Sequence, residues 1–170
     1  MFSLVKMRRS ARSCNDLTAV TQAFYTGQVM TLALNDKPYP YAVPVNYAPL
    51  ELDNELYLIF HGAQAGRRYT LLQQQPQVGF SIILDYKLGL KDSACASTCF
   101  YRSLCGDGIV HRFEGERALL ALQTLMTHLG STIDKERMQA QLRQGMRQVN
   151  CCALQVVHAG LKSNPACVSH

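Results

Sequence analysis

Short apolar segments that follow one another through short turns are the feature that most constrains the fold. Residues 29–34 and 39–47 are rich in aliphatic and aromatic side chains, and only the turn 35–38 separates them. Similar segments follow at 56–61, 78–84, 98–113 and 151–158. Strands joined by tight turns pair in antiparallel fashion, because a parallel pair needs a crossover of roughly a dozen residues. The pattern predicts a mainly β fold of the α+β class, an antiparallel barrel of six strands with flanking helices, and disfavours a doubly wound parallel sheet.

Apolar side chains at helical spacing predict several helices around these strands. The first covers residues 16–25, with Asn15 or Asp16 as its N-cap and Gly27 as its stop. Further helices are expected at 65–75, at 114–129 before a capping Gly130, and at 134–145. Two segments are predicted to be irregular, an acidic turn at 50–55 and a loop at 86–97.

The chain of 170 residues has the size of one domain with a real core. It contains no internal repeat and no interdomain linker. We therefore expect a single domain over residues 1–170, with a basic N-terminal arm at 1–14 and a polar tail at 161–170.

The formal net charge of +5 is a mild basic excess, whereas nucleic-acid-binding proteins usually show a denser basic stripe. Four cations gather in the first dozen residues: Lys6, Arg8, Arg9 and Arg12. They could form an arm that reaches for anions, or a solvated end at the rim of an interface. A nucleic-acid partner is not expected.

Membrane and metal binding are not expected either. No apolar run approaches the roughly 18 residues that span a bilayer, and the N-terminus lacks the apolar middle section of a signal peptide. We therefore expect a cytoplasmic protein, whose cysteines are free thiols. There are seven: Cys14, Cys95, Cys99, Cys105, Cys151, Cys152 and Cys167. The spacing of Cys95 and Cys99 lacks the second ligand pair of a zinc site.

A turn of small residues leads into two arginines after the strand at 56–61. Gly62, Ala63 and Gly66 allow a close approach of the backbone, and Arg67 and Arg68 carry planar guanidinium groups that pair with phosphate oxygens. If a helix begins here, its first N–H groups add to an anion site. The alternative is two surface arginines, at a helix end whose dipole disfavours cations.

Two further groups could contact a ligand. His61 ends an apolar strand, where it could be a half-buried structural histidine or a hydrogen-bond donor near neutral pH. In the segment Tyr101-Arg102-Ser103, alternation puts Tyr101 and Ser103 on one face of a strand, although Arg102 alone would suit any surface strand.

Other catalytic signatures are missing from the sequence. It has no G-x-G-x-x-G after a strand, no P-loop, no G-x-S-x-G and no carboxylate pair arranged for glycosidase chemistry. The histidines at 111, 128, 158 and 170 are scattered, so no haem ligand can be chosen among them.

Four segments in order resemble a known family. They are Met7-Arg8-Arg9, residues 32–34 with 39–47, Leu58 to Arg68, and Tyr101-Arg102-Ser103 with Gly106 and Gly108. Over about residues 7–130, and to about 160 with the last strand, the chain resembles the pyridoxamine 5′-phosphate oxidase-like FMN-binding split-barrel superfamily. Within it, the nitroimidazole-reductase (Nim-type) branch is the most similar.

This resemblance implies a six-stranded split barrel that forms a homodimer with two FMN sites at the subunit interface. It also implies roles for particular residues. Pro44, Val45 and Asn46 would lie along the isoalloxazine ring, His61, Gly62 and Ala63 around the flavin, Arg67 and Arg68 on its phosphate, and Ser103 near the cofactor. His61 is the candidate catalytic residue.

Two departures from the family pattern bear on the substrate. Many Nim-type proteins have a histidine and a lysine where Arg67 and Arg68 stand, and the Arg-x-His-like substrate motif of pyridoxamine phosphate oxidases is missing from the tail 164–170. We therefore expect an FMN-dependent oxidoreductase that acts on a small organic acceptor, not on vitamin B6. The alternative is a carrier or sensor without fast turnover, and the cofactor alternatives are another flavin, a deazaflavin or haem.

Overall fold

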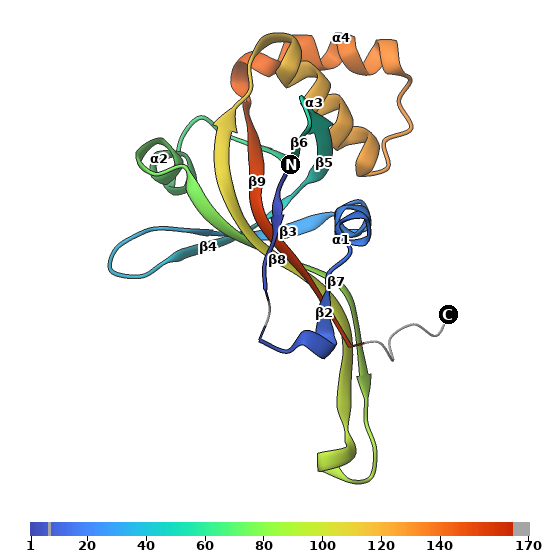
Figure 1. Cartoon of the computed structure of the whole chain (residues 1–170). Coiled ribbons are helices and arrows are strands. Elements are labelled where there is room, and N and C mark those ends of the chain that lie inside the picture. The colour runs from blue at the N-terminus through green and yellow to red at the C-terminus, as the bar shows by residue number, and fades with distance from the viewer. Residues whose placement is uncertain (7, 165–170) are drawn as a thin grey trace.

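The computed structural model describes residues 1–6 and 8–164, which contain a curled antiparallel sheet and four α-helices (Figure 1). The strands are β1 Ser3–Leu4, β2 Ser13–Cys14, β3 Val29–Leu34, β4 Tyr41–Asn46, β5 Ala48–Leu52, β6 Glu55–Gly62, β7 Gln77–Gly89, β8 Thr98–Arg112 and β9 Asn150–Ser163. Their order across the sheet is β4–β3–β7–β8–β9–β6–β5, and β1 and β2 pair with β9. Only β1 pairs in parallel among these described strands. The predicted mainly β, antiparallel architecture with flanking helices is confirmed.

The predicted number of six strands is wrong, since the described residues contain nine. Two of the additional strands are the two-residue β1 and β2, and the third is β5, in the segment that its acidic residues mark as a turn. The real turn between β5 and β6 is only Asp53 and Asn54, with φ angles of +54° and +62°. Both residue types tolerate the left-handed region that a two-residue hairpin turn requires. Glu51 points outward and stays exposed, so its charge does not oppose the strand.

Residues 1–14 lie against the sheet rather than forming a separate arm. Val5 N donates to Ala159 O at 2.9 Å, and Phe2 is buried in the barrel core. The cations Lys6, Arg8 and Arg9 are exposed at the surface. The predicted polar tail also begins too early, because β9 continues to Ser163 and buries Leu161; residues 165–170 lie outside the described residues.

The four α-helices lie near the predicted positions. They are α1 Leu17–Phe24, α2 Arg67–Gln74, α3 Gly115–His128 and α4 Lys135–Gly145, and the 3-10 turns are η1 Ser10–Arg12, η2 Ala94–Ala96 and η3 Met146–Gln148. Asp16 is the N-cap of α1. Gly27 does not stop this helix; its missing Cβ leaves room for the Tyr47 hydroxyl, which donates to Phe24 O at 2.8 Å. Gly130 follows α3 with a φ of +92°, as a capping glycine does.

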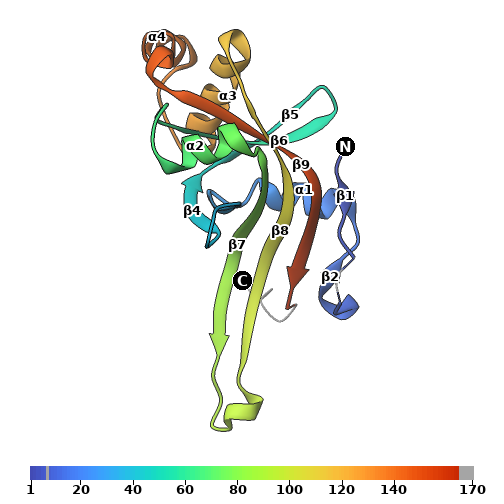
Figure 2. The same cartoon turned by 90° about the vertical axis from the view of Figure 1, so that its left-hand side faces the viewer.

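Two apolar cores lie on opposite faces of β6. Leu58 and Phe60 point into the barrel interior, whereas Ile59 packs toward α3. Helices α3 and α4 cover this second face at one end of the sheet (Figure 2). Because successive side chains of a strand point to opposite faces, the next two residues, His61 and Gly62, are also directed to different sides of β6.

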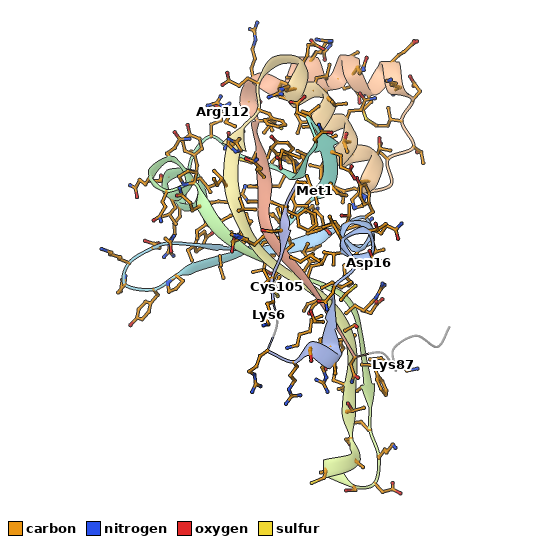
Figure 3. The ribbon with its side chains drawn as sticks, in the orientation of Figure 1. Met1, Lys6, Asp16, Lys87, Cys105 and Arg112 are labelled. Carbon is orange, nitrogen blue, oxygen red and sulfur yellow. The ribbon has the colours of Figure 1, made fainter. Side chains whose placement is uncertain are left out.

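Strands β7 and β8 project beyond the barrel as a long hairpin (Figures 1 and 2). The predicted loop at 86–97 begins as strand, because β7 continues to Gly89, which pairs with Thr98. Lys87 lies in this projecting hairpin, and Arg112 lies at the opposite end of β8, near α3 and α4 (Figure 3).

Candidate functional site

The predicted phosphate-binding turn leads directly into α2. Gly66 has φ +93° and ψ 172°, a conformation that favours glycine, and the helix begins at Arg67 rather than near residue 65. Thr70 N donates to Gly66 O at 3.0 Å, so the three N–H groups before it belong to the open first turn of the helix. The first turn contains no acidic residue. The positive end of the helix dipole therefore coincides with two guanidinium groups, which favours an anion at this place.

Arg67 is held against the hairpin of β3 and β4. Its Nε lies 2.7 Å and its Nη2 2.6 Å from Asp36 Oδ2, and its guanidinium lies 4.5 Å from the centre of the Tyr41 ring. The hydrogen bond from Arg67 lowers the pKa of Asp36. The arrangement orients the guanidinium, while Asp36 competes with any anion that Arg67 binds.

Arg68 is held on the other side of α2, against the end of β6. A Cβ atom at Gly62 would collide with Arg68 Nη2, so the guanidinium occupies the space that the glycine leaves open. Nη2 donates to His61 O at 3.1 Å, and the guanidinium carbon lies 5.7 Å from the centre of the Phe60 ring. Arg67 is thus fixed to the hairpin of β3 and β4, and Arg68 to the end of β6, and both belong to the first turn of α2.

His61 points away from this pair of arginines. Its side chain lines a cavity of about 180 Å³ under α3 and α4, together with apolar residues such as Leu125, Met126 and Leu142. Partial burial of the ring, with a smaller contribution from the Arg68 charge, lowers the pKa of His61 from 6.5. The imidazole is therefore neutral at pH 7, with one nitrogen that donates and one that accepts.

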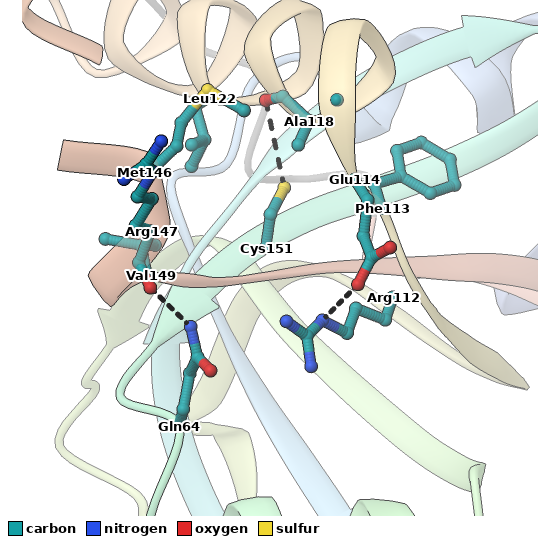
Figure 4. Close-up of a pocket in the computed structure, with 11 residues that line it drawn as sticks. Gln64, Arg112, Phe113, Glu114, Ala118, Leu122, Met146, Arg147, Val149 and Cys151 are labelled. Carbon is teal, nitrogen blue, oxygen red and sulfur yellow. Dashed lines mark hydrogen bonds and ion pairs between the residues drawn. The ribbon is translucent and has the colours of Figure 1, made fainter. Parts of the chain in front are cut away.

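A second cavity of about 220 Å³ adjoins the first and is more polar (Figure 4). Leu122, Met146 and Val149 line both cavities. Arg112 enters the second cavity from β8 and pairs with Glu114 at 3.1 Å. The buried thiol of Cys151 also lies here, and burial raises its pKa to about 12, so it is protonated at neutral pH.

The other predicted cofactor residues are distributed over the sheet. Pro44 and Asn46 are exposed on the outer face of β4, whereas Val45 is buried in the barrel core. Ala63 is exposed in the turn between β6 and α2. Ser103 pairs with Ile83 of β7, six residues along the strand from Gln77, which corresponds to roughly 20 Å at the usual rise of a strand. Ser103 thus lies in the middle part of the β7–β8 ladder, whereas Arg67 and Arg68 contact Asp36 and the end of β6.

Sequence reasoning missed two polar residues near the arginines. Gln64 donates from Nε2 to Arg147 O at 3.0 Å and lines the second cavity (Figure 4). Asn150 lies directly opposite Gly62 in the register of β6 and β9, and it is buried. Its place before the apolar strand at 151–158 gave no signal, because only the pairing of two distant strands brings it to the site.

The curled antiparallel sheet with its flanking helices has the architecture of a split-barrel protein. The helix α2 beside it begins with two arginines. The chain matches the family model described as pyridoxamine 5′-phosphate oxidase over residues 18–159. It therefore belongs to this family, which confirms the resemblance stated from the sequence motifs. None of the curated proteins matches the chain.

Several solved structures share the fold. A proposed 5-nitroimidazole antibiotic resistance protein from Bacteroides thetaiotaomicron has 21% identity and a TM-score of 0.68, with 88% of this chain and 85% of that chain covered. A flavocytochrome from Azotobacter vinelandii has 16% identity and a TM-score of 0.69, with 94% and 72% covered. An FAD- and heme-binding protein from Mycobacterium smegmatis has 16% identity and a TM-score of 0.72, with 91% and 74% covered.

Residues 1–6 and 8–164 contain neither a membrane-spanning helix nor a cluster of metal ligands. None of their helices has both the length and the apolar character to cross a membrane. In the same ranges, no three His, Cys, Asp or Glu side chains are arranged to hold a metal ion.

Proposed function

We propose that this chain is an FMN-dependent oxidoreductase that acts on a small organic acceptor. The observation that carries the proposal is the guanidinium of Arg68, seated on the bare backbone of Gly62 beside Arg67 and the N-terminus of α2. A phosphate between the two arginines would meet two cationic forks and the open N–H groups of a helix. These residues therefore fit the phosphate group of FMN.

The residues of this chain would bind and orient the flavin. Arg67, now paired with Asp36, and Arg68, now donating to His61 O, would hold the phosphate through their remaining guanidinium N–H groups. When bound, FMN supplies the reversible transfer of hydride or electrons, and the protein contributes orientation and electrostatics.

The cavity beside His61, on the face of β6 directed away from Arg67 and Arg68, would suit a small, largely apolar molecule. Its volume of about 180 Å³ and its apolar lining from α3 and α4 favour an organic molecule over an ion. His61, neutral at pH 7, lines this cavity, where it can donate a hydrogen bond to the acceptor from one ring nitrogen or accept one at the other.

The proposal includes a homodimer with the flavin at the subunit interface. Support comes from the outer face of the sheet, where Val29 is 50% and Ile83 is 70% exposed. Apolar side chains on a sheet face that stay this exposed are typical of an interaction surface. Ser103 lies beside Ile83 in the register, so in such a dimer it would serve the flavin of the other subunit. The six described cysteines are free thiols, which supports the cytoplasm as the compartment.

A second candidate is a carrier or sensor that holds flavin, deazaflavin or haem without fast turnover. It is favoured by the proteins of the same fold described as a flavocytochrome and as an FAD- and heme-binding protein.

The visible absorption spectrum of the purified protein tests the proposal. We expect flavin absorbance, or a rise in melting temperature when FMN is added to a colourless sample. A Soret band would favour haem instead. A colourless sample without a thermal shift would contradict flavin binding altogether. Steady-state oxidation of NAD(P)H with candidate acceptors then separates the two candidates, since a carrier shows only slow reduction.

A further inference from the structure

Asn150 is a buried polar residue with an unused hydrogen-bond acceptor. Its exposed fraction is 6%, and its Nδ2 donates to Cys152 Sγ at 3.2 Å. Its Oδ1 has no hydrogen-bond partner among the residues that the structure describes. Buried amide oxygens nearly always accept a hydrogen bond, because an unpaired one loses its hydration without any compensating interaction.

The orphaned oxygen lies on the same face of the sheet as the seat of Arg68. Asn150 and Gly62 are direct partners across β9 and β6, and directly paired residues of neighbouring strands project their side chains to the same face. The Arg68 guanidinium occupies this face of Gly62. Asn150 therefore lies on the neighbouring strand β9, on the same face as the Arg68 guanidinium.

A second cation borders the same place. Arg112 of β8 lies opposite Cys152 of β9 in the register of the two strands. Cys152 follows Asn150 by two residues, so the two side chains project to the same face of β9. The charges of Arg68 and Arg112 both act on the Cys152 thiol and lower its pKa, although burial dominates and raises it to about 11. Two guanidinium groups thus act on the thiol to which Asn150 Nδ2 donates.

We propose that Asn150 Oδ1 accepts a hydrogen bond from a ribityl hydroxyl of the flavin whose phosphate Arg67 and Arg68 bind. This inference rests on the proposed function. In FMN the phosphate is joined to the hydroxyl-bearing ribityl chain, so the group that lies next to a phosphate on Arg68 is a polyol. Its hydroxyls are the donors that an unpaired amide oxygen lacks. Asn150 is therefore a cofactor-positioning residue, and the flavin site extends from α2 inward along β6 and β9.

The test uses Asn150→Leu in the full-length protein, with FMN, riboflavin and lumiflavin as ligands. Lumiflavin retains the ring but has no ribityl hydroxyls. We expect the affinity for FMN and for riboflavin to fall roughly tenfold, as for the loss of one hydrogen bond. The affinity for lumiflavin should stay the same, and the melting temperature of the flavin-free protein should not fall, because the variant removes an unpaired buried oxygen.

Two control variants keep the test decisive. Cys152→Ser changes the partner of Asn150 Nδ2 and should leave riboflavin affinity unchanged. Asn150→Asp retains an acceptor oxygen, so its affinity for riboflavin should stay within about twofold of the wild-type value. This variant still tests the inference if Asn150→Leu does not fold. Unchanged FMN and riboflavin affinity in Asn150→Leu, an equal loss for lumiflavin, or a loss in Asn150→Asp as large as in Asn150→Leu would overturn the inference. Failure of the wild type to bind any flavin would instead overturn the proposed function.

Discussion

At the scale of single residues, one missing side chain creates the candidate phosphate site. Gly62 has no Cβ, so the guanidinium of Arg68 can lie on the end of β6 and donate to His61 O. The Phe60 ring beneath it adds a cation–π contact. A guanidinium held this way pays little of the ordering cost when it binds an anion.

The substitution Gly62→Ala should separate cofactor binding from folding. The new methyl group displaces the flexible end of Arg68 rather than backbone, so the fold should survive while FMN affinity falls roughly tenfold or more, as for a lost charge-assisted hydrogen bond. Isothermal titration calorimetry with FMN measures the change. Gly145→Ala in α4 is the matched control, because a Cβ there meets nothing within 4 Å. If Gly62→Ala bound FMN as tightly as this control, the position of the Arg68 guanidinium over Gly62 would not matter for FMN binding, which would contradict the proposal.

His61 predicts how stability depends on pH. Its pKa is lowered in the folded state, so the unfolded chain binds the proton more readily, and stability rises with pH. The contribution is complete above the unfolded pKa of about 6.5 and is lost as the pH falls through the lower, folded value. Melting temperatures between pH 5 and 7.5 should therefore drop less in His61→Gln than in the wild type. Identical pH profiles of the two proteins would contradict a lowered pKa of His61 in the folded state.

At the scale of elements, β6 decides the geometry of the site. Its residues alternate between the barrel core and the core under α3, and this alternation directs Gly62 toward Arg68 and His61 toward the apolar cavity of about 180 Å³ under α3 and α4. The periodicity of the sequence cannot reveal such an arrangement, because a strand buried on both faces is apolar at every position. The sequence predicted the strand and the turn into α2, but not that its last two residues face different sides, Gly62 the Arg68 guanidinium and His61 the apolar cavity.

The strand β5 shows why the number of strands could not be predicted. Its hairpin with β6 closes through Asp53 and Asn54 alone, and an acidic segment resembles a longer turn. By contrast, β3 matches the predicted segment 29–34, since apolar residues and turn signals mark both of its ends. Contacts that depend on the pairing of distant strands, such as Asn150 beside Gly62, have no local signature at all.

The two-residue turn makes a prediction about stability. Asn54 has a φ of +62°, which alanine adopts at a cost of about 1–2 kcal/mol and glycine without strain. Asn54→Ala should lower the free energy of unfolding by about 1 kcal/mol, whereas Asn54→Gly should leave it unchanged or raise it. Urea denaturation of the flavin-free protein measures both. If alanine and glycine were equally stable, the proposed turn geometry would be wrong.

At the scale of the whole molecule, the proposed function requires two copies of the chain. The apolar side chains of Val29 and Ile83 are exposed on the outer face of the sheet, and Ser103 lies beside Ile83 in the register of β7 and β8. In the proposed dimer, a single chain would supply only the phosphate end of the cofactor site that its sequence motifs predict. The family match covers residues 18–159, which include both parts of that site.

The substitution Ile83→Glu tests the dimer. Two copies of a new carboxylate on the apolar outer face would be desolvated on association, so we expect a monomer by size-exclusion chromatography with light scattering, together with weaker FMN binding. Leu120→Glu, at a residue 43% exposed on α3, is the matched control and should remain a dimer. A monomeric wild type would contradict the interface, as would a variant that dimerises normally.

The most direct test of the central claim compares FMN with riboflavin in the double variant Arg67→Ala, Arg68→Ala. The two ligands differ only in the phosphate, so riboflavin reports whether the rest of the site is intact. Losing two charge-assisted contacts should weaken FMN binding roughly 100-fold, while riboflavin affinity should change less than about threefold. That outcome would establish Arg67 and Arg68 as the phosphate clamp. An equal loss of affinity for both flavins would contradict it.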